Sequence, residues 1–349
     1  MPLKVLTLNT WTGFDAHGRF RLGRYEDDLA CRRRREALVD FVRHVDPDIV
    51  SLQEVFPMPG GVAELVRAIG GEFVSQVANA GVRLFGHGFP IGFSEGLVTV
   101  VRHGLSIKKS SSVKLSGPWT WFWHDAVAVQ TAEARWLVEV EIAGYCHPLH
   151  VFNLHTHFSP PDTEAIREDS ESCPGSSDVT KSASRSIRDG LRRRRSEIQD
   201  AFSYVHWVCQ DRPALILGDL NMEPTDDWLG SLMRKEGLTD LLSSDNSPTW
   251  NPGQNPLAAL STSIDFPTGQ RKTGIDMVSA FYDRLPKRVD YIFAKSFPIS
   301  TKLINAHVAP AMSPEGVWFS DHSAVVAILD DTATSISPAT YTKTTDPLF

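Results

Sequence analysis

The sequence predicts an α+β domain built on mixed β-sheet that is packed on both of its faces. Short uninterrupted apolar runs, such as Leu215–Leu217, have the composition of strands that are buried on both sides. Between them lie segments whose apolar residues recur at helical spacing, for example from Leu29 to His44. Polar residues follow several of the runs directly, as Asp219 and Asn221 do, and side chains one residue apart on a strand share a face.

Length and composition fit a single soluble domain. The chain has 349 residues, of which 42% are hydrophobic and 22% are charged. No internal repeat or linker divides it, so we expect one domain over residues 1–330 and a disordered tail over residues 331–349. The four cysteines lack metal-ligand spacing, which indicates a reduced protein. Without a signal-peptide core or a long apolar run, we expect an intracellular protein, cytoplasmic or peripherally membrane-associated.

The formal net charge of −7 bears on the partners of the chain. A dedicated nucleic-acid binder draws most of its affinity from basic contacts to phosphates, so no stable nucleic-acid partner is expected. A bound cation would change the sign of the charge locally, which keeps the argument from being decisive. Nothing in the sequence indicates the oligomeric state.

The N-terminal part contains three expected strands, which are Leu3–Leu8, Ile49–Val55 and Glu95–Val101. The first delivers Asn9 to its end, where the alternative is an asparagine that caps a turn. The second carries Glu54 among apolar residues. Because a glutamate is costly to bury unless it is paired or bound to a metal, a metal ligand is favoured over a surface strand.

The middle of the chain adds one or two strands over Ala126–Ile142 and another over Val151–Phe158. The aromatic segment Trp119–Trp123 predicts a strand that buries alternate rings, and the alternative is a loop that enters a lipid interface. His155 and His157 lie on one face of their strand. Such a pair favours a functional role and also resembles half of a metal site.

A polar segment without periodicity, Ser159–Gly190, predicts a mobile insertion placed where it can gate these histidines. The following residues, Leu191–Val208, form an expected helix with an inward apolar face made of Ile198, Phe202, Val205 and Val208. Arg192–Arg195 then form the solvated first turn of this helix rather than a phosphate site.

The C-terminal part begins with an expected helix, Trp228–Leu242, and an irregular stretch, Ser247–Leu285. Arg288–Phe293 is a strand that contains an acid at position 290. The last strand, Ala324–Leu329, directly follows Asp321 and His322.

The polar residues near strand ends form a set with a common chemistry. Its members are Asn9, Glu54, His155, Asp219, Asn221, Asp290, Asp321 and His322. Oxygen donors such as those of Glu54, Asn9 and Asp321 suit Mg²⁺, whereas the ligand pattern of zinc is missing. An Asp–His pair suits general-base catalysis. With no nucleophile elbow and no phosphate-binding glycine loop, metal-assisted hydrolysis of a phosphate ester is the best supported reaction.

Seven segments in order make the chain resemble the endonuclease/exonuclease/phosphatase superfamily, whose fold is DNase I-like. They are Leu8–Trp11, Leu52–Val55, Gly96–Val98, Leu154–His157, Gly218–Asn221, Arg288–Tyr291 and Ser320–His322. Within the superfamily the chain is most similar to neutral sphingomyelinases. That finer similarity rests on the paired histidines, on Asn221–Pro224 and on Pro248–Pro252.

The resemblance implies a four-layer sandwich of two packed mixed sheets flanked by helices, and a single catalytic domain. It implies that Glu54 binds Mg²⁺, or Mn²⁺, with Asn9 close to the metal and Asp321 completing the shell. His322 would be the general base, oriented by Asp290. Asp219 and Asn221 would position the attacking water and a phosphoryl oxygen, and His155 would stabilise the transition state. The implied substrate is a phospholipid at a membrane surface, sphingomyelin or a related phosphosphingolipid.

Three departures from the sphingomyelinase pattern concern the substrate more than the chemistry. The chain ends in a polar tail where membrane-type relatives carry apolar spans, and its Ser159–Gly190 insertion is unusually long. His124–Ala126 stands where relatives often have a lysine. A nuclease of the DNase I or abasic-endonuclease type is therefore the alternative enzyme, and a catalytically inactive binding scaffold is the non-enzymatic one.

Overall fold

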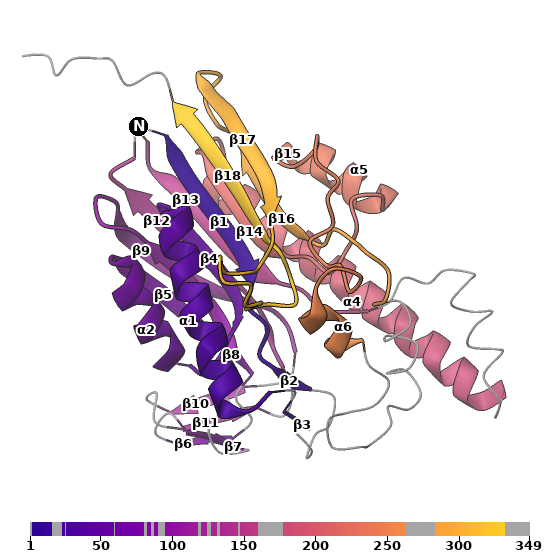
Figure 1. Cartoon of the computed structure of the whole chain (residues 1–349). Helices are drawn as coiled ribbons and strands as arrows, with labels where there is room; N and C mark the ends of the chain where they lie inside the picture. The colour runs from indigo at the N-terminus through magenta and orange to yellow at the C-terminus, as the bar shows by residue number, and fades with distance from the viewer. Residues whose placement is uncertain are drawn as a thin grey trace, which may run out of the picture.

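The computed structural model describes most of the chain (Figure 1). The described residues are 2–15, 23–24, 26–58, 60–79, 82–84, 87–89, 95–117, 120–123, 127–130, 133–145, 147–159, 177–262 and 283–331. Several sequence predictions fall outside them, namely those on Trp119, on His124–Ala126, on the 160–176 part of the insertion and on the tail after Asp331.

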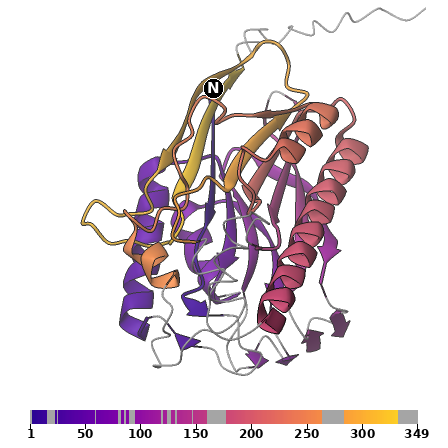
Figure 2. The ribbon, with the colours of Figure 1, turned by 90° about the vertical axis from the view of Figure 1, so that its right-hand side faces the viewer.

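Two six-stranded mixed sheets pack face to face, with helices on their outer sides (Figures 1 and 2). The first sheet has the order β17 (Thr301–Ala309), β18 (Ala324–Asp331), β1 (Leu3–Asn9), β4 (Ile49–Val55), β8 (Glu95–Val101), β5 (Glu72–Asn79). The second has the order β15 (Leu238–Asp240), β16 (Asp290–Lys295), β14 (Ala214–Asp219), β13 (Leu149–His155), β12 (Arg135–Ala143), β9 (Ser106–Ser116). The arrangement confirms the expected four-layer sandwich.

Two smaller sheets lie at one end of this sandwich (Figure 1). One has the order β10 (Thr120–Trp123), β11 (Val127–Gln130), β6 (Val82–Leu84), β7 (His87–Phe89), and the other pairs β2 (Phe14–Asp15) with β3 (Gly23–Arg24). Thr120–Trp123 of the aromatic segment therefore form a strand, and the burial of alternate rings stays a prediction.

Each large sheet is covered on its outer face by two helices. On the first sheet these are α1 (Asp28–Val45) and α2 (Gly60–Ile69), and on the second they are α4 (Ser177–Cys209) and α5 (Asp227–Glu236). A short helix, α6 (Pro256–Ser261), lies in the long connection before β16. None of the helices within the described ranges is long and apolar enough to cross a membrane.

Three apolar clusters fill the spaces between the four layers. In β1, Val5 belongs to the cluster between the sheets, whereas Leu6 and Leu8 pack under α1. In β14, Leu217 lies between the sheets and Ile216 packs under α4. Because alternate side chains enter different apolar layers, a central strand can be apolar on both faces, as Leu215–Leu217 of β14 is.

Two expected helices have different ends in the structure. The helix predicted over Trp228–Leu242 ends at Glu236, because Gly237 adopts a left-handed conformation with φ 66° and the chain then enters β15. The helix predicted from Leu191 begins at Ser177, so residues 177–190 of the expected insertion are helical. The prediction of a solvated Arg192–Arg195 turn is wrong for Arg194, which is 4% exposed.

Candidate active site

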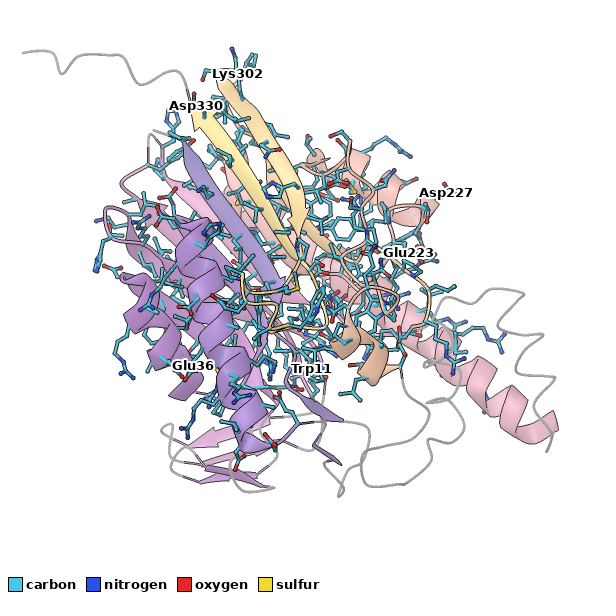
Figure 3. All side chains as sticks on the ribbon, viewed as in Figure 1. Trp11, Glu36, Glu223, Asp227, Lys302 and Asp330 are labelled. Carbon is cyan, nitrogen blue, oxygen red and sulfur yellow. The ribbon has the colours of Figure 1, made fainter. Side chains whose placement is uncertain are left out.

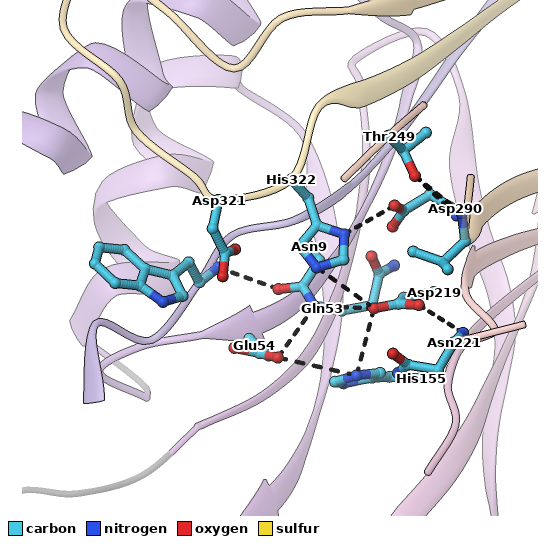
Figure 4. A network of polar contacts seen from close by, with 12 residues as sticks. Asn9, Gln53, Glu54, His155, Asp219, Asn221, Thr249, Asp290, Asp321 and His322 are labelled. Atoms are coloured by element: carbon cyan, nitrogen blue, oxygen red, sulfur yellow. Dashed lines mark hydrogen bonds and ion pairs between the residues drawn. The ribbon is translucent and has the colours of Figure 1, made fainter. Parts of the chain in front are cut away.

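The polar residues expected from the sequence gather at one end of the two large sheets (Figure 4). Asn9 continues the row of β1 side chains that faces the second sheet, and His155 and Asp219 continue the corresponding rows of β13 and β14. The β14 row is apolar until Asp219, whereas the β1 and β13 rows turn polar one position earlier, at Thr7 and Asn153. The pleat of the strands therefore delivers three polar side chains to the seam between the sheets.

Glu54 reaches the same seam through a local irregularity in β4. The register between β4 and β8 shifts between Leu52 and Val55, and Glu54 itself has φ 54°. A bulge of this kind turns a side chain away from the face that strict alternation would give it. Trp11 and Asn221 also have positive φ, at 56° and 50°. Such conformations are uncommon outside glycine and cluster at functional sites.

Asp219 is the centre of the contact network, and it is 1% exposed. Its Oδ1 accepts from the backbone N–H of Asn221 at 2.7 Å and its Oδ2 accepts from Asn9 Nδ2 at 3.2 Å. His155 Nε2 lies 3.7 Å and His322 Nε2 lies 3.8 Å from the same Oδ2. One carboxylate oxygen thus faces both histidines that the sequence singled out for catalysis.

Asn9 joins this carboxylate to Glu54. Its Nδ2 also donates to Glu54 Oε1 at 3.0 Å, and its Oδ1 accepts from the backbone N–H of Trp11 at 3.1 Å. The backbone N–H of Thr12 donates to the other Glu54 oxygen at 3.3 Å. Asn9 therefore contacts two carboxylates and also caps the turn that follows it, so both interpretations of the sequence apply.

His322 and Asp290 form the shortest charged contact of the cluster. His322 Nδ1 lies 2.8 Å from Asp290 Oδ2, and both side chains are buried. The loop that carries His322 is held by Ser320, whose Oγ donates to the carbonyl oxygen of Asn9 and accepts from the backbone N–H of His322 at 3.0 Å. A carboxylate that contacts Nδ1 fixes the tautomer of the His322 ring, and Nε2 is then directed toward Asp219.

Burial and mutual charge shift the pKa values of this cluster. Burial raises the pKa of Asp219 to about 7, and the neighbouring Asp290 adds to that rise. Burial alone would lower the pKa of His322, but Asp290 and Asp219 outweigh it and raise the pKa to about 10. For His155, burial and then Arg135 hold the pKa well below its usual value. His155 is therefore neutral at neutral pH, whereas His322 carries a proton when no cation is bound.

Glu54 and Asp321 have the chemistry of a divalent-cation site. Asp321 is 5% exposed, and its Oδ1 has no hydrogen-bond partner in the described part of the chain. Burial raises the pKa of Asp321 to about 7, and the negative charge of Glu54 contributes to that rise. A buried, unpartnered carboxylate oxygen, with a second carboxylate near enough to raise its pKa, fits a hard cation that accepts oxygen ligands.

A second set of potential ligands shares no residue with the first. Asp219, Asp290 and His322 each offer one ligand atom within 4.8 Å of the others. The 2.8 Å contact between His322 and Asp290 uses one nitrogen and one oxygen of this set. That Glu54 and Asp321 bind the metal ion stays a prediction from the sequence.

Arg194 is a site residue that the sequence did not identify. From α4 it donates to the carbonyl oxygens of Asn221 and, at 2.7 Å, of Ser159. Glu197, one turn further on, accepts from the backbone N–H of His157 at 2.6 Å. The two charged side chains fix the loops that follow β13 and β14. Arg194 lies in a run of four arginines, and only its burial distinguishes it from the others.

The fold and sequence were compared with known proteins. The family model described as "Endonuclease/Exonuclease/phosphatase family" matches residues 6–322. No significant match was found among curated proteins.

Solved structures with the same fold cover nearly the whole chain. An endonuclease/exonuclease/phosphatase from Bacteroides vulgatus is 15% identical with a TM-score of 0.55, over 95% of this chain and 99% of that one. TDP2 of D. rerio in complex with a single-strand DNA product is 14% identical with a TM-score of 0.55, over 94% and 99%. A protein from Beutenbergia cavernae is 20% identical with a TM-score of 0.52, over 94% and 71%. At these identities the likeness concerns the fold.

Proposed function

The chain belongs to the endonuclease/exonuclease/phosphatase family, and within it we propose a Mg²⁺-dependent phosphodiesterase that hydrolyses sphingomyelin or a related phosphosphingolipid. Members of this family are hydrolases of phosphate esters that generally depend on a divalent metal ion. The observation that carries the proposal is the cluster in which His322, paired with Asp290, faces Asp219 beside the carboxylates of Glu54 and Asp321. The finer choice of a lipid rests on sequence segments.

The proposed reaction is the attack of water on phosphorus. His322 Nε2 accepts the proton of the attacking water while the new P–O bond forms, and Asp290 stabilises the resulting imidazolium. Asp219 and Asn221 orient the water and a phosphoryl oxygen. The bond from phosphorus to the ceramide oxygen then breaks, and the leaving oxygen takes up a proton. The products are ceramide and phosphocholine.

His155 has a different role from His322 in this scheme. Because its pKa lies well below the usual value, it acts as a neutral imidazole whose N–H donates to a phosphoryl oxygen. Neutrality also avoids placing a second positive charge beside His322, whose charge is one of the causes of the low pKa.

Glu54 and Asp321 would hold the Mg²⁺, and Asn9 would keep Glu54 in place. Bound there, Mg²⁺ supplies positive charge that offsets the negative charge developing on the phosphate oxygens. A cation held by Glu54 and Asp321 would also disfavour a positive charge on His322, so it would lower the raised pKa of this residue and favour proton acceptance.

A lipid substrate is favoured by three sequence features. These are the paired histidines, the segment Asn221–Pro224 and the segment Pro248–Pro252, all of which resemble those of neutral sphingomyelinases. The net charge of −7 also disfavours a polyanionic substrate. The phospholipid would be met at a membrane surface.

The deciding experiment offers a lipid and a nucleic acid to the same preparation. We expect phosphocholine release from sphingomyelin in detergent micelles with Mg²⁺ at neutral pH, and no nicking of supercoiled plasmid. The His322→Ala variant is the control for contaminating activity. Nicking of the plasmid without lipid hydrolysis would reject the lipid assignment.

A nuclease is the second candidate, because one structure of the same fold is TDP2 bound to a single-strand DNA product. The reaction at phosphorus would be the same, and only the group on the leaving oxygen would differ. In the plasmid assay a nuclease would convert supercoiled to nicked circles in a Mg²⁺-dependent manner, and the lipid would be left intact.

A further inference from the structure

The segment Pro248–Pro252, which the proposed reaction does not use, touches both members of the Asp290–His322 pair. Thr249 is 1% exposed and Trp250 is 7% exposed. Trp250 forms isolated β-bridges with His322 on one side and with Lys287 on the other. The segment therefore lies between the start of β16 and the loop that leads into β18.

Thr249 is hydrogen-bonded to both of these elements (Figure 4). Its Oγ1 accepts from the backbone N–H of Val289 at 3.1 Å and from that of Asp290 at 3.2 Å. Its carbonyl oxygen accepts from the backbone N–H of Ser323 at 2.6 Å. Thr249 is thus hydrogen-bonded both to the backbone of Asp290 and to the backbone of Ser323, which follows His322.

Trp250, the next residue in the chain, restrains the position of Thr249. The indole packs edge-on against the His322 ring, with the ring centroids 5.1 Å apart and an interplanar angle of 70°. The backbone of Trp250 exchanges hydrogen bonds of 3.0 and 2.9 Å with Lys287, and its Nε1 donates to the carbonyl oxygen of Asp283 at 2.6 Å. Thr249 is therefore not free to follow a movement of Asp290.

The Asp290 carboxylate depends on such support. It is fully buried, its Oδ2 contacts His322, and its Oδ1 has no hydrogen-bond partner among the residues that the structure describes. The direction of the side chain is then set by the backbone of Asp290, and Thr249 is the side chain that holds this backbone N–H. A displacement of about 1 Å at a catalytic group can lower a rate by about 10²-fold.

We propose that Thr249 is a positioning residue that sets the separation of Asp290 and His322 through its hydroxyl group. It touches neither substrate nor the reacting atoms. The inference rests on the proposed phosphodiesterase chemistry, but not on the choice between lipid and nucleic acid.

The test compares Thr249→Val, which keeps the shape and removes the acceptor, with Thr249→Ser, which keeps the hydroxyl. The substrate is bis(4-nitrophenyl) phosphate with Mg²⁺, which reports on phosphodiester hydrolysis without a lipid. For Thr249→Val we expect kcat to fall about 10- to 100-fold while KM stays nearly unchanged. Thr249→Ser should stay close to the wild-type kcat.

The same substitution in an Asp290→Ala background separates positioning from a general loss of structure. If Thr249 acts through Asp290, then Thr249→Val causes no further loss of kcat in that background. A loss of equal size in both backgrounds, or an unchanged kcat in Thr249→Val, overturns the proposal. Thr249→Ala takes the place of the valine variant if the latter does not fold.

A spectroscopic measurement decides the question without a substrate. The Nδ1 proton of His322 should give a downfield proton NMR signal that is absent in Asp290→Ala. We expect this signal to move upfield in Thr249→Val and to keep its position in Thr249→Ser. An unmoved signal in Thr249→Val overturns the proposal. If the wild type hydrolyses no phosphodiester, the proposed function fails, while the NMR signal still tests the role of Thr249.

Discussion

His322 Nδ1 and Asp290 Oδ2 lie 2.8 Å apart although the two residues lie on segments that lead to different sheets. Asp290 begins β16 of the second sheet, and His322 precedes β18 of the first. The remaining site residues divide in the same way, with Asn9 and Glu54 on the first sheet and His155 on the second. The site is therefore a property of how the two sheets pack, since neither sheet contains a complete set.

Replacing His322 by alanine should abolish most of the activity. The variant lacks the group that accepts the proton of water, so we expect kcat to fall about 10²- to 10⁴-fold. His103→Ala is the matched control, because His103 is an exposed histidine in the turn after β8. Hydrolysis of a phosphodiester by both variants is measured under the same conditions. Full turnover in His322→Ala would reject His322 as the base.

Removal of divalent cations should abolish activity, and added Mg²⁺ should restore it. Because a ligand that binds only the folded state stabilises it, Mg²⁺ should also raise the melting temperature of the wild type. In Glu54→Gln we expect the Mg²⁺ concentration for half-maximal activity to rise and the thermal shift to shrink. Glu64→Gln is the control, since Glu64 lies on the surface of α2. Equal responses in both variants would place the cation elsewhere.

The stability of the metal-free protein should depend on the charge of Asp321. Its pKa in the folded state is about 7, above the usual aspartate value of 3.8, because burial and Glu54 disfavour the carboxylate. A raised carboxyl pKa contributes stability that is fully present at low pH and is lost as pH rises through about 7. Asp321→Asn should therefore melt at a higher temperature than the wild type at pH 8, in the presence of a chelator.

The difference in melting temperature between Asp321→Asn and the wild type should shrink as the pH is lowered toward 3.8, the usual pKa of an aspartate side chain. Thermal melts across the pH range measure it. With Mg²⁺ present the wild type should gain stability and the variant should gain less, because a cation ligand is missing. A difference between the two proteins that does not change with pH would contradict the assigned titration.

Gly218→Ala should damage both the fold and the site. Gly218 has φ 146°, and a Cβ there would lie 1.9 Å from the carbonyl oxygen of Leu154 on the neighbouring strand. We expect a loss of about 1–3 kcal/mol in the free energy of unfolding, and a lower kcat because Asp219 is displaced. Gly104→Ala is the control, since Gly104 also has a positive φ, 101°, but nothing lies within 4 Å. Equal losses of stability would show that steric contact is not the cause.

The sequence predicted the central strands of both large sheets and none of their edge strands. Segments rich in apolar residues mark β1, β4, β8 and β18 in the first sheet and β12, β13, β14 and β16 in the second. The edges are β5 and β17 in one sheet and β9 and β15 in the other. An edge strand such as Ser106–Ser116 is rich in serine and lysine, which protect an exposed edge and remove the apolar pattern.

The sequence predicts the end of a helix correctly where one local residue or motif ends the helix. Asp46 ends α1 in a left-handed conformation with φ 54°, at the Asp-Pro-Asp break that the sequence shows. At α5 the apolar leucines that follow Gly237 extended the predicted helix into β15. The beginning of α4 has few apolar residues, so a helix there produces no periodic signal.

All eight predicted site residues come together, because strand exits can be recognised from the sequence. The residues that hold them in place could not be recognised in the same way. Arg194 and Thr249 act through backbone groups of residues that are distant in the chain, and only burial and hydrogen bonding distinguish them. Glu54 was identified by its cost of burial, whereas the bulge that aims it depends on the pairing of β4 with β8.

The position of β18 determines when during synthesis the enzyme can exist. This strand comes last among the described strands, yet it pairs with β1, the first, and lies inside its sheet with β17 beyond it. The ribosome therefore holds an incomplete first sheet until residues 324–331 have emerged. His322 is also made late, so a nascent chain lacks the residue that we propose as the base. We therefore expect a chain that stops before β18 to be inactive.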